Sequence, residues 1–166
     1  EYEHLRNRVI ILDGWSKTYA MTGWRVGYGV WPSSLIDQAT RLSINVHSCV
    51  NASAQLAGIA ALNGPQDAVN EMVKAFDTRR RVIVDELNSV PGFNCPEPGG
   101  AFYAFPNITG TNIGSMNLQN KLLNEAGVAI ISGTSFGALG EGYLRFSYAN
   151  STENIIEAIR RVKECL

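Results

Sequence analysis

The 166-residue sequence predicts an α/β fold in two parts, and three observations support this prediction. Short runs rich in β-branched and other apolar residues, typical of strands, occur near the start of the chain and again in its last third. Between them, residues 65–90 carry apolar side chains mostly at spacings of three, four and seven, which predicts a long helix with one apolar face. Beyond this helix, predicted strands and helices alternate, as in a compact domain of two layers. We therefore expect one part over residues 1–75 and a small α/β domain over residues 76–166.

The first part is expected to contain two strands and two helices. Residues 9–12 (Val-Ile-Ile-Leu) are predicted to form a buried strand, and residues 25–31 a second strand. Ser33 or Ser34 is expected to cap the helix that follows. The two predicted helices are residues 33–46 and the small-residue stretch 52–62.

Four short strands and two helices are expected in the second part. The strands are apolar, and the last of them alternates apolar with polar side chains. Ser151 or Thr152 is expected to cap the final helix, in which apolar residues recur at helical spacing. The predicted strands are residues 93–95, 101–105, 128–130 and 143–148, and the other helix is residues 117–126.

The composition argues against several classes of function. With 45% hydrophobic and 17% charged residues, the chain can bury a substantial core. A net charge of −1 argues against nucleic acid or an anionic membrane as the main partner. No signal peptide is visible and no apolar run approaches the length that spans a membrane, so a cytoplasmic protein is expected.

The three cysteines are odd in number and show no CxxC spacing, so we expect free thiols in a reducing compartment. Cys49 lies two residues after His47, a pair that could belong to a metal site. No second pair of ligands follows at the spacing that zinc needs, so no metal site is expected.

The segment from Asp13 to Tyr28 carries the strongest functional signal in the sequence. Lys17 lies just after the first predicted strand, where burial would desolvate its amine and make it a competent nucleophile. Arg25 follows eight residues later among glycines that permit a close backbone approach, and its guanidinium could fork onto a phosphate. Ser16 could add a hydroxyl to the same site. Pyridoxal phosphate requires such a pair, because it offers an aldehyde at one end and a phosphate at the other.

Residues 16–25 (Ser-Lys-Thr-Tyr-Ala-Met-Thr-Gly-Trp-Arg) resemble the lysine motif of the class I aminotransferases, which are fold type I pyridoxal-phosphate enzymes of the aspartate aminotransferase superfamily. Three later blocks resemble family segments and occur in the family's order, so that the resemblance covers nearly the whole chain. No single block is specific, but the combination is. The later blocks are residues 98–105, residues 127–137 with Ser132 where proline is usual, and residues 142–149.

The resemblance implies the C-terminal part of a fold type I enzyme. Residues 1–75 would be the end of the large cofactor-binding domain, and residues 76–166 the small C-terminal domain. In the family, the segment before the lysine supplies most of the cofactor pocket, and this sequence does not contain it. Tyr2 resembles a piece near a family tyrosine that contacts the cofactor, but it stands too close to Lys17, so an ordinary loop is expected there.

By the resemblance, Lys17 would be the catalytic lysine, which binds the cofactor and then moves the proton at the substrate Cα. Arg25 and, more weakly, Ser16 would bind the cofactor phosphate. The chain departs from the family at Gly14, where a phosphate-binding serine is frequent, and at Trp15, which is bulkier than the family usually allows. The first departure removes a phosphate hydroxyl, and the second changes the packing of the lysine turn.

Arg145 is the candidate for substrate binding. It stands in an alternating strand and shares a face with Tyr143 and Ser147. An arginine in a strand otherwise fit for a core needs an anionic partner. The resemblance implies that this partner is the substrate carboxylate, which a guanidinium binds in a bidentate manner. The alternative is an ion pair with a glutamate such as Glu141.

The expected function is that of a pyridoxal-phosphate-dependent aminotransferase, which moves an amino group from an amino acid to a 2-oxo acid. The resemblance implies a homodimer as the parent assembly. Two alternatives stay open. A C–S lyase of the same fold would use the same cofactor, and the residues that decide between the two reactions lie outside this chain. The chain could also be a folded domain that is not catalytic by itself.

Overall fold

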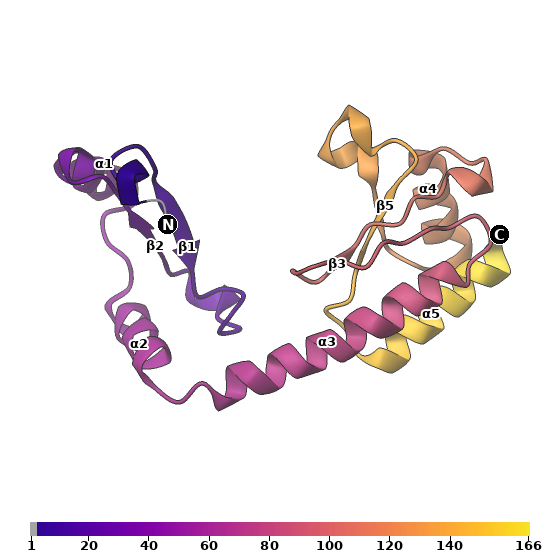
Figure 1. Cartoon of the computed structure of the whole chain (residues 1–166), viewed down its shortest axis with the longest axis horizontal. Coiled ribbons are helices and arrows are strands. Elements are labelled where there is room, and N and C mark those ends of the chain that lie inside the picture. The colour runs from indigo at the N-terminus through magenta and orange to yellow at the C-terminus, as the bar shows by residue number, and fades with distance from the viewer. Residues whose placement is uncertain (1–2) are drawn as a thin grey trace. The chain divides into compact units, whose positions relative to one another are not determined.

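The structure, a computed structural model, describes residues 3–166, so the interpretation of Tyr2 lies outside the described residues. The chain divides into two compact units (Figure 1). Unit 1 ends at Asn70, and unit 2 runs from Glu71 to Leu166. This division falls inside the long helix, near the boundary expected after residue 75. The assignment of the two units to a large and a small domain stays a prediction.

Unit 1 contains a two-stranded antiparallel sheet and two α-helices. In this sheet Gly14 lies opposite Gly27, where a Cβ on Gly27 would stand 3.0 Å from the carbonyl oxygen of Asp13. A side chain at either position would require the facing backbone to move by a few tenths of an ångström, which favours glycine at each. The elements are β1 (Ile11–Gly14), β2 (Gly27–Val30), α1 (Ile36–His47) and α2 (Ala52–Asn63).

The first strand differs from its prediction in position and in burial. It begins at Ile11 rather than Val9, and Leu12 keeps 74% of its surface exposed. The prediction of a buried strand is wrong because an apolar run is buried only where another layer covers it, and no described part of unit 1 covers this one. The predicted cap by Ser33 or Ser34 is also wrong. A 3-10 turn over Ser33–Leu35 precedes α1, and the N-cap residue of α1 is Leu35, whose side chain makes no capping hydrogen bond.

Unit 2 is a two-layer α/β arrangement. Its three antiparallel strands have the order β3-β5-β4, so β5 is central. Three helices pack on one face of this sheet, with α3 and α5 side by side (Figure 1). The elements are α3 (Asp67–Asn88), which begins in unit 1, β3 (Tyr103–Ala104), α4 (Ser115–Ala126), β4 (Ile131–Ser132), β5 (Leu144–Ser147) and α5 (Thr152–Cys165).

The core of unit 2 lies between the sheet and the helices. Leu144 and Phe146 point into it from β5, and they alternate with Arg145 and Ser147 on the other face. This alternation follows from the two-residue period of a strand. The helices contribute buried side chains at helical spacing, which are Ile83, Leu87, Leu118, Leu122, Ile155, Ile159 and Val162.

Two predicted strands of unit 2 are wrong and one predicted cap is confirmed. Residues 93–95 contain only an isolated bridge, from Asn94 to Asn107. Residues 128–130 are not a strand, and β4 begins at Ile131, which lies opposite Arg145. The Ser151 hydroxyl accepts a hydrogen bond from the Asn154 N–H at 3.2 Å and so caps α5. Within the described residues, none of the helices combines the length and the apolar character that crossing a membrane demands.

Candidate active-site residues

Lys17 lies in the turn that follows β1 in unit 1. The turn is closed by backbone hydrogen bonds from Tyr19 N–H to the Trp15 carbonyl and from Ala20 N–H to the Lys17 carbonyl, each at 3.2 Å. Ala20 has a φ of 53°, in the left-handed region where a residue with a side chain is strained. Lys17 itself is exposed, so the expectation of a desolvated amine is not met within this chain. Burial would require a covering layer, as it would for β1.

The lysine turn is anchored to α2 through Trp15. The indole Nε1–H donates to the carbonyl oxygen of Gly58 at 3.0 Å, and a Cβ on Gly58 would stand 3.1 Å from the indole ring. A glycine in the middle of a helix costs roughly 0.5–1 kcal/mol relative to alanine, and here it makes room for the large ring. The bulk of Trp15, a departure from the resembled family, is therefore accommodated by a small residue 43 positions later.

Arg25 lines a concave pocket that lies entirely within unit 1. The residue has a φ of 53°, and its Nη1–H donates to the carbonyl oxygen of Thr22 at 2.9 Å. The pocket has a volume of about 990 Å³. Its described lining contains no carboxylate, so the positive charge of Arg25 favours an anion there. The other lining residues include Ala20, Gly23, Gly27, Asn51 and Ser53.

These residues fit a phosphate group, and Ser16 fits less directly. A guanidinium with unused N–H donors in a concavity without acidic residues is a suitable anion site. Ser16 is half-buried beside Lys17 but is not among the residues that line the pocket of Arg25. The structure thus places Arg25 in a pocket suited to an anion and Ser16 in the lysine turn.

Arg145 lies on the face of the unit 2 sheet that is opposite the core. Its guanidinium carbon is 4.3 Å from the centroid of the Tyr103 ring and 4.4 Å from that of the Phe136 ring. The same face carries Phe105, whose ring stacks on Tyr143 with centroids 5.4 Å apart. Arg145 is thus half-buried among aromatic rings and not in the aliphatic core.

The ion pair between Arg145 and Glu141 is not present in the described part of the chain. Glu141 instead accepts a hydrogen bond at Oε1 from the N–H of Ser115, at 3.0 Å, at the first residue of α4. A carboxylate at a helix N-terminus is stabilised by the unpaired N–H groups and by the helix dipole. Glu141 therefore has a structural role, and Arg145 forms no ion pair with any described residue.

Ser132 has a role that the usual proline could not fulfil. Its backbone N–H donates to Oε1 of Gln119 in α4 at 2.6 Å, and proline has no such donor. Its hydroxyl lies 2.7 Å from that of Thr134. Gly133 then starts a 3-10 turn that ends at Phe136. The departure from the resembled motif thus ties α4 to the turn that carries one of the rings beside Arg145.

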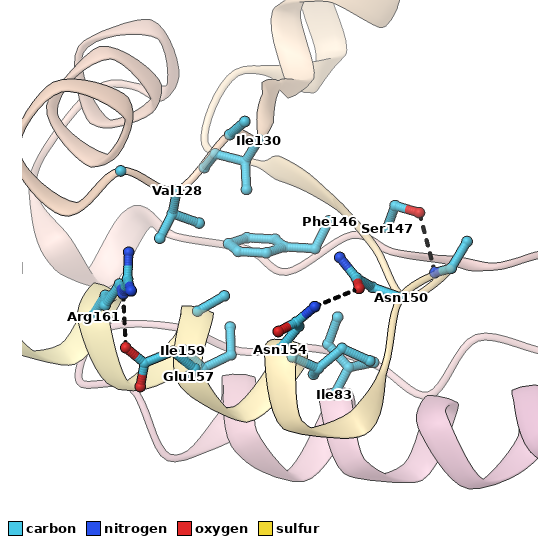
Figure 2. Close-up of a pocket in the computed structure, with 15 residues that line it drawn as sticks. Ile83, Val128, Ile130, Phe146, Ser147, Asn150, Asn154, Glu157, Ile159 and Arg161 are labelled. Atoms are coloured by element: carbon cyan, nitrogen blue, oxygen red, sulfur yellow. Dashed lines mark hydrogen bonds and ion pairs between the residues drawn. The ribbon is translucent and has the colours of Figure 1, made fainter.

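A second pocket of unit 2 is a weaker candidate for a site. It has a volume of about 420 Å³ and lies beside α5, and Phe146 is among the residues that line it (Figure 2). Its polar side chains bind one another: Asn154 donates to Asn150 at 2.9 Å, and Arg161 donates to Glu157 at 2.8 Å. Two arginines beside Glu157 lower the pKa of its carboxyl to about 2. Because these groups are already paired, they present no convergent set of free donors or acceptors to a ligand.

The structure describes all three cysteines and, within residues 3–166, the side chains that could bind a metal ion. Cys49, Cys95 and Cys165 are free thiols, as predicted. Burial raises the pKa of the Cys95 thiol to about 11, which makes it a poor nucleophile. In residues 3–166, His, Cys, Asp and Glu side chains form no group of three or more that could hold a metal ion.

Comparison with known proteins places the chain in a family. The sequence profile of the family "Aminotransferase class I and II" matches residues 1–162. The chain belongs to this family. Its relatives include the aspartate aminotransferase of Pyrococcus horikoshii, which is 46% identical over 159 residues, and that of Streptomyces avermitilis, which is 43% identical over 171 residues.

Solved structures of aminotransferases have the same fold in the matched part. An aromatic aminotransferase from Pyrococcus horikoshii OT3 matches with a TM-score of 0.94 at 38% identity, over 98% of this chain and 44% of that one. The aspartate aminotransferase from Rhizobium meliloti matches with a TM-score of 0.92 at 36% identity, over 97% and 42%. The two aspartate aminotransferases compared by sequence are matched over 95% and 98% of this chain and over 41% of their own lengths. The chain therefore spans less than half of the aminotransferases that it matches.

The sequence predicts Lys17, Arg25 and Arg145 as candidate site residues but does not predict their neighbours. The rings of Tyr103 and Phe136 beside Arg145 were not predicted, because they come from segments 33 positions apart. The aromatic block at residues 98–105 was a usable signal for the first ring. Nothing local indicated that Gly58 receives Trp15, since the two residues meet only in the folded unit.

Proposed function

We propose that this chain serves a pyridoxal-phosphate-dependent aminotransferase, which moves an amino group from an amino acid to a 2-oxo acid. Members of the family use this cofactor. When bound, pyridoxal phosphate supplies an aldehyde that reacts with amines and a ring that withdraws electrons from the substrate. The observation that carries the proposal is the placement of Lys17 and Arg25 in one unit, on the segments that join β1 to β2, with Arg25 in a pocket suited to an anion.

In this proposal the chain's own residues bind, orient and transfer a proton. The Nζ atom of Lys17 is the nucleophile that holds the cofactor and then moves the proton at the substrate Cα. The guanidinium of Arg25 binds the phosphate, and Ser16 adds a hydroxyl at the lysine turn. The guanidinium of Arg145 binds the α-carboxylate of the amino acid or the oxo acid. We further propose a homodimer in the cytoplasm, with which the free thiols are compatible.

Covalent capture of the cofactor tests the role of Lys17. The chain is mixed with pyridoxal phosphate, reduced with borohydride and digested, and the labelled peptide is mapped. Saturable labelling at Lys17 is expected, with loss of that peptide in Lys17→Ala. The exposed Lys74, which is paired with Glu71, provides the control, because Lys74→Ala should leave the label at Lys17 in place. Labelling spread over many lysines would show that this chain by itself has no cofactor subsite and is a non-catalytic domain.

The role of Arg25 is tested by comparing two forms of the cofactor. Arg25→Met should weaken binding of pyridoxal phosphate by about ten- to a hundredfold, the range for a lost charge-assisted hydrogen bond. The same variant should bind pyridoxal, which has no phosphate, as the wild type does. An equal loss for both compounds would contradict phosphate recognition by Arg25.

The reaction itself is tested with the full-length holoenzyme. Amino-group transfer from L-aspartate to a 2-oxo acid is the expected activity, on the basis of the named relatives. A C–S lyase of the same fold would instead break the Cβ–S bond of a β-thio amino acid and, with water, release a thiol, pyruvate and ammonia. Product analysis with both substrates separates the two reactions.

A further inference from the structure

Two aromatic rings enclose the guanidinium of Arg145 on the open face of the unit 2 sheet. The guanidinium carbon lies over Tyr103 at 4.3 Å and over Phe136 at 4.4 Å. Both rings contact this carbon, and each has a different aromatic partner, which is Phe102 for Tyr103 and Phe105 for Phe136. A planar cation between two rings is attracted by the negative face of each.

Each of the two rings is supported by other aromatic residues. Tyr103 contacts the ring of Phe102 at 4.6 Å, and Phe102 contacts Phe76 of α3 at 6.0 Å. Phe136 meets Phe105 edge to face at 6.3 Å. Edge-to-face and tilted ring pairs at these separations are favourable. The rings are therefore fixed by their own neighbours and do not depend on Arg145 for their position.

The turn that carries Phe136 is held independently by its backbone. Gly133 and Gly140 pack so closely that a Cβ on either would clash with the carbonyl oxygen of the other. The N–H of Gly133 donates to the carbonyl of Tyr143 at 2.9 Å, which ties the turn to the residue just before β5, the strand that contains Arg145. Together with the bond from Ser132 to Gln119, these contacts set the distance between Phe136 and β5.

We propose that Tyr103 and Phe136 are positioning residues, which fix the plane of the Arg145 guanidinium so that its N–H edges face a substrate carboxylate. In this proposal the two rings cover the faces of the guanidinium and leave its edges, where all five N–H groups lie. A carboxylate binds an arginine edge through two parallel N–H···O bonds in that same plane. Because the plane is fixed before binding, less conformational entropy is lost when the carboxylate arrives.

This proposal rests on the proposed function in one respect, the assignment of the substrate carboxylate to Arg145. The ordering of the guanidinium does not depend on that assignment and can be measured in the chain without any ligand. The ¹⁵N order parameter of the Arg145 Nε–H should exceed about 0.6 in the wild type, the level below which a group counts as flexible. It should fall below that level when Tyr103→Leu and Phe136→Leu are combined.

Steady-state kinetics of the full-length holoenzyme with L-aspartate supply the functional half of the test. Each leucine substitution should raise KM about threefold and the pair about tenfold, with kcat within twofold of the wild type, since cation–π contacts are of that size. Tyr103→Phe and Phe136→Tyr keep the rings and should keep the wild-type KM. Tyr143→Leu removes an aromatic side chain from the same face without uncovering the guanidinium, and it serves as the control.

The outcomes separate the two proposals. Loss of order together with the rise in KM supports the positioning role. An Arg145 that stays ordered in the double variant overturns it, and so does a loss of order that leaves KM unchanged. Arg145→Met tests the proposed function separately. An unchanged KM in that variant would contradict binding of the substrate carboxylate by Arg145, independently of the result for the two rings.

Discussion

Units 1 and 2 of this chain differ in how they bury their apolar residues. Within the described residues, sixteen buried apolar residues of unit 2 form one cluster that joins its sheet to three helices. In the described part of unit 1, only Met21, Val26 and Ala54 form such a cluster, with Trp15 and Tyr19 packed against it. The apolar side chains of β1, β2, α1 and α2 are instead largely exposed.

This difference shows that similar apolar content can have opposite consequences. Unit 2 places its apolar residues at the period of each element and has a second layer to receive them. Unit 1 has apolar strands and helices without a described layer over them, and large exposed apolar surfaces are typical of interaction sites. We therefore expect unit 2 to be the more stable of the two and unit 1 to open more readily.

The largest expected effect is on thiol reactivity. Cys49 is exposed in unit 1, whereas Cys95 is buried in unit 2 with its pKa raised to about 11 by burial. At pH 8 we expect iodoacetamide to modify Cys95 at least about a hundredfold more slowly than Cys49, because the thiolate is the reactive form and must also be accessible. Peptide mapping over time measures both rates. In denaturant the rates should converge, and similar rates without denaturant would contradict the difference between the units.

The next largest effect is on the free energy of unfolding when a leucine is truncated. Leu87→Ala in the core of unit 2 should cost about 2–5 kcal/mol, because Leu87 is fully buried and the substitution leaves a cavity. Leu12→Ala in β1 should cost less than about 0.5 kcal/mol, because Leu12 is 74% exposed. Urea denaturation followed by circular dichroism measures the first loss. All three tryptophans lie in unit 1, so their fluorescence follows that unit. A comparable loss in both variants would contradict the contrast in burial.

Helix caps provide a smaller and better matched comparison. Asn51 caps α2 in unit 1 by accepting a hydrogen bond from Ala54 N–H at 3.1 Å, and Ser151 caps α5 in unit 2 in the same way. Removing either cap with alanine should cost about 1 kcal/mol. Asn51→Ala should shift only the fluorescence transition, and Ser151→Ala should shift the transition of unit 2. The conservative changes Asn51→Asp and Ser151→Thr should restore most of each loss. If either alanine variant shifted both transitions equally, the units would unfold as one.

The smallest expected effect is a loss of stability of unit 2 at low pH. Hydrogen bonds from Arg160 and Arg161 lower the pKa of Glu157 to about 2, below its usual value of 4.5. A lowered folded-state pKa means that the contribution to stability is complete above about pH 4.5 and is lost as the pH falls toward 2. The urea midpoint of Glu157→Gln, measured by circular dichroism, should therefore be lower than that of the wild type at neutral pH. The two midpoints should approach each other as the pH falls from about 4.5 toward 2. Tryptophan fluorescence should not distinguish the two proteins, and a difference in the urea midpoint that was as large at pH 2 as at neutral pH would contradict this account.

Local patterns predicted the helices better than the strands. The helices α2, α3, α4 and α5 lie within a few residues of their predicted bounds, because helical spacing and capping residues act over short distances. Strand bounds depend on a partner. Residues 128–130 are apolar, yet pairing begins at Ile131, because the register with β5 sets Ile131 opposite Arg145.

The sequence alone determined the family and the three candidate side chains of the site. Lys17, Arg25 and Arg145 are candidates because each stands in a local motif, and the combination of motifs indicates the family that matches residues 1–162; their roles stay predictions. Only the tertiary structure decided that β1 is exposed, that Gly58 makes room for Trp15 and that two rings enclose Arg145. These features depend on residues tens of positions apart that meet after folding, and no periodicity along the chain encodes which distant residue becomes a neighbour.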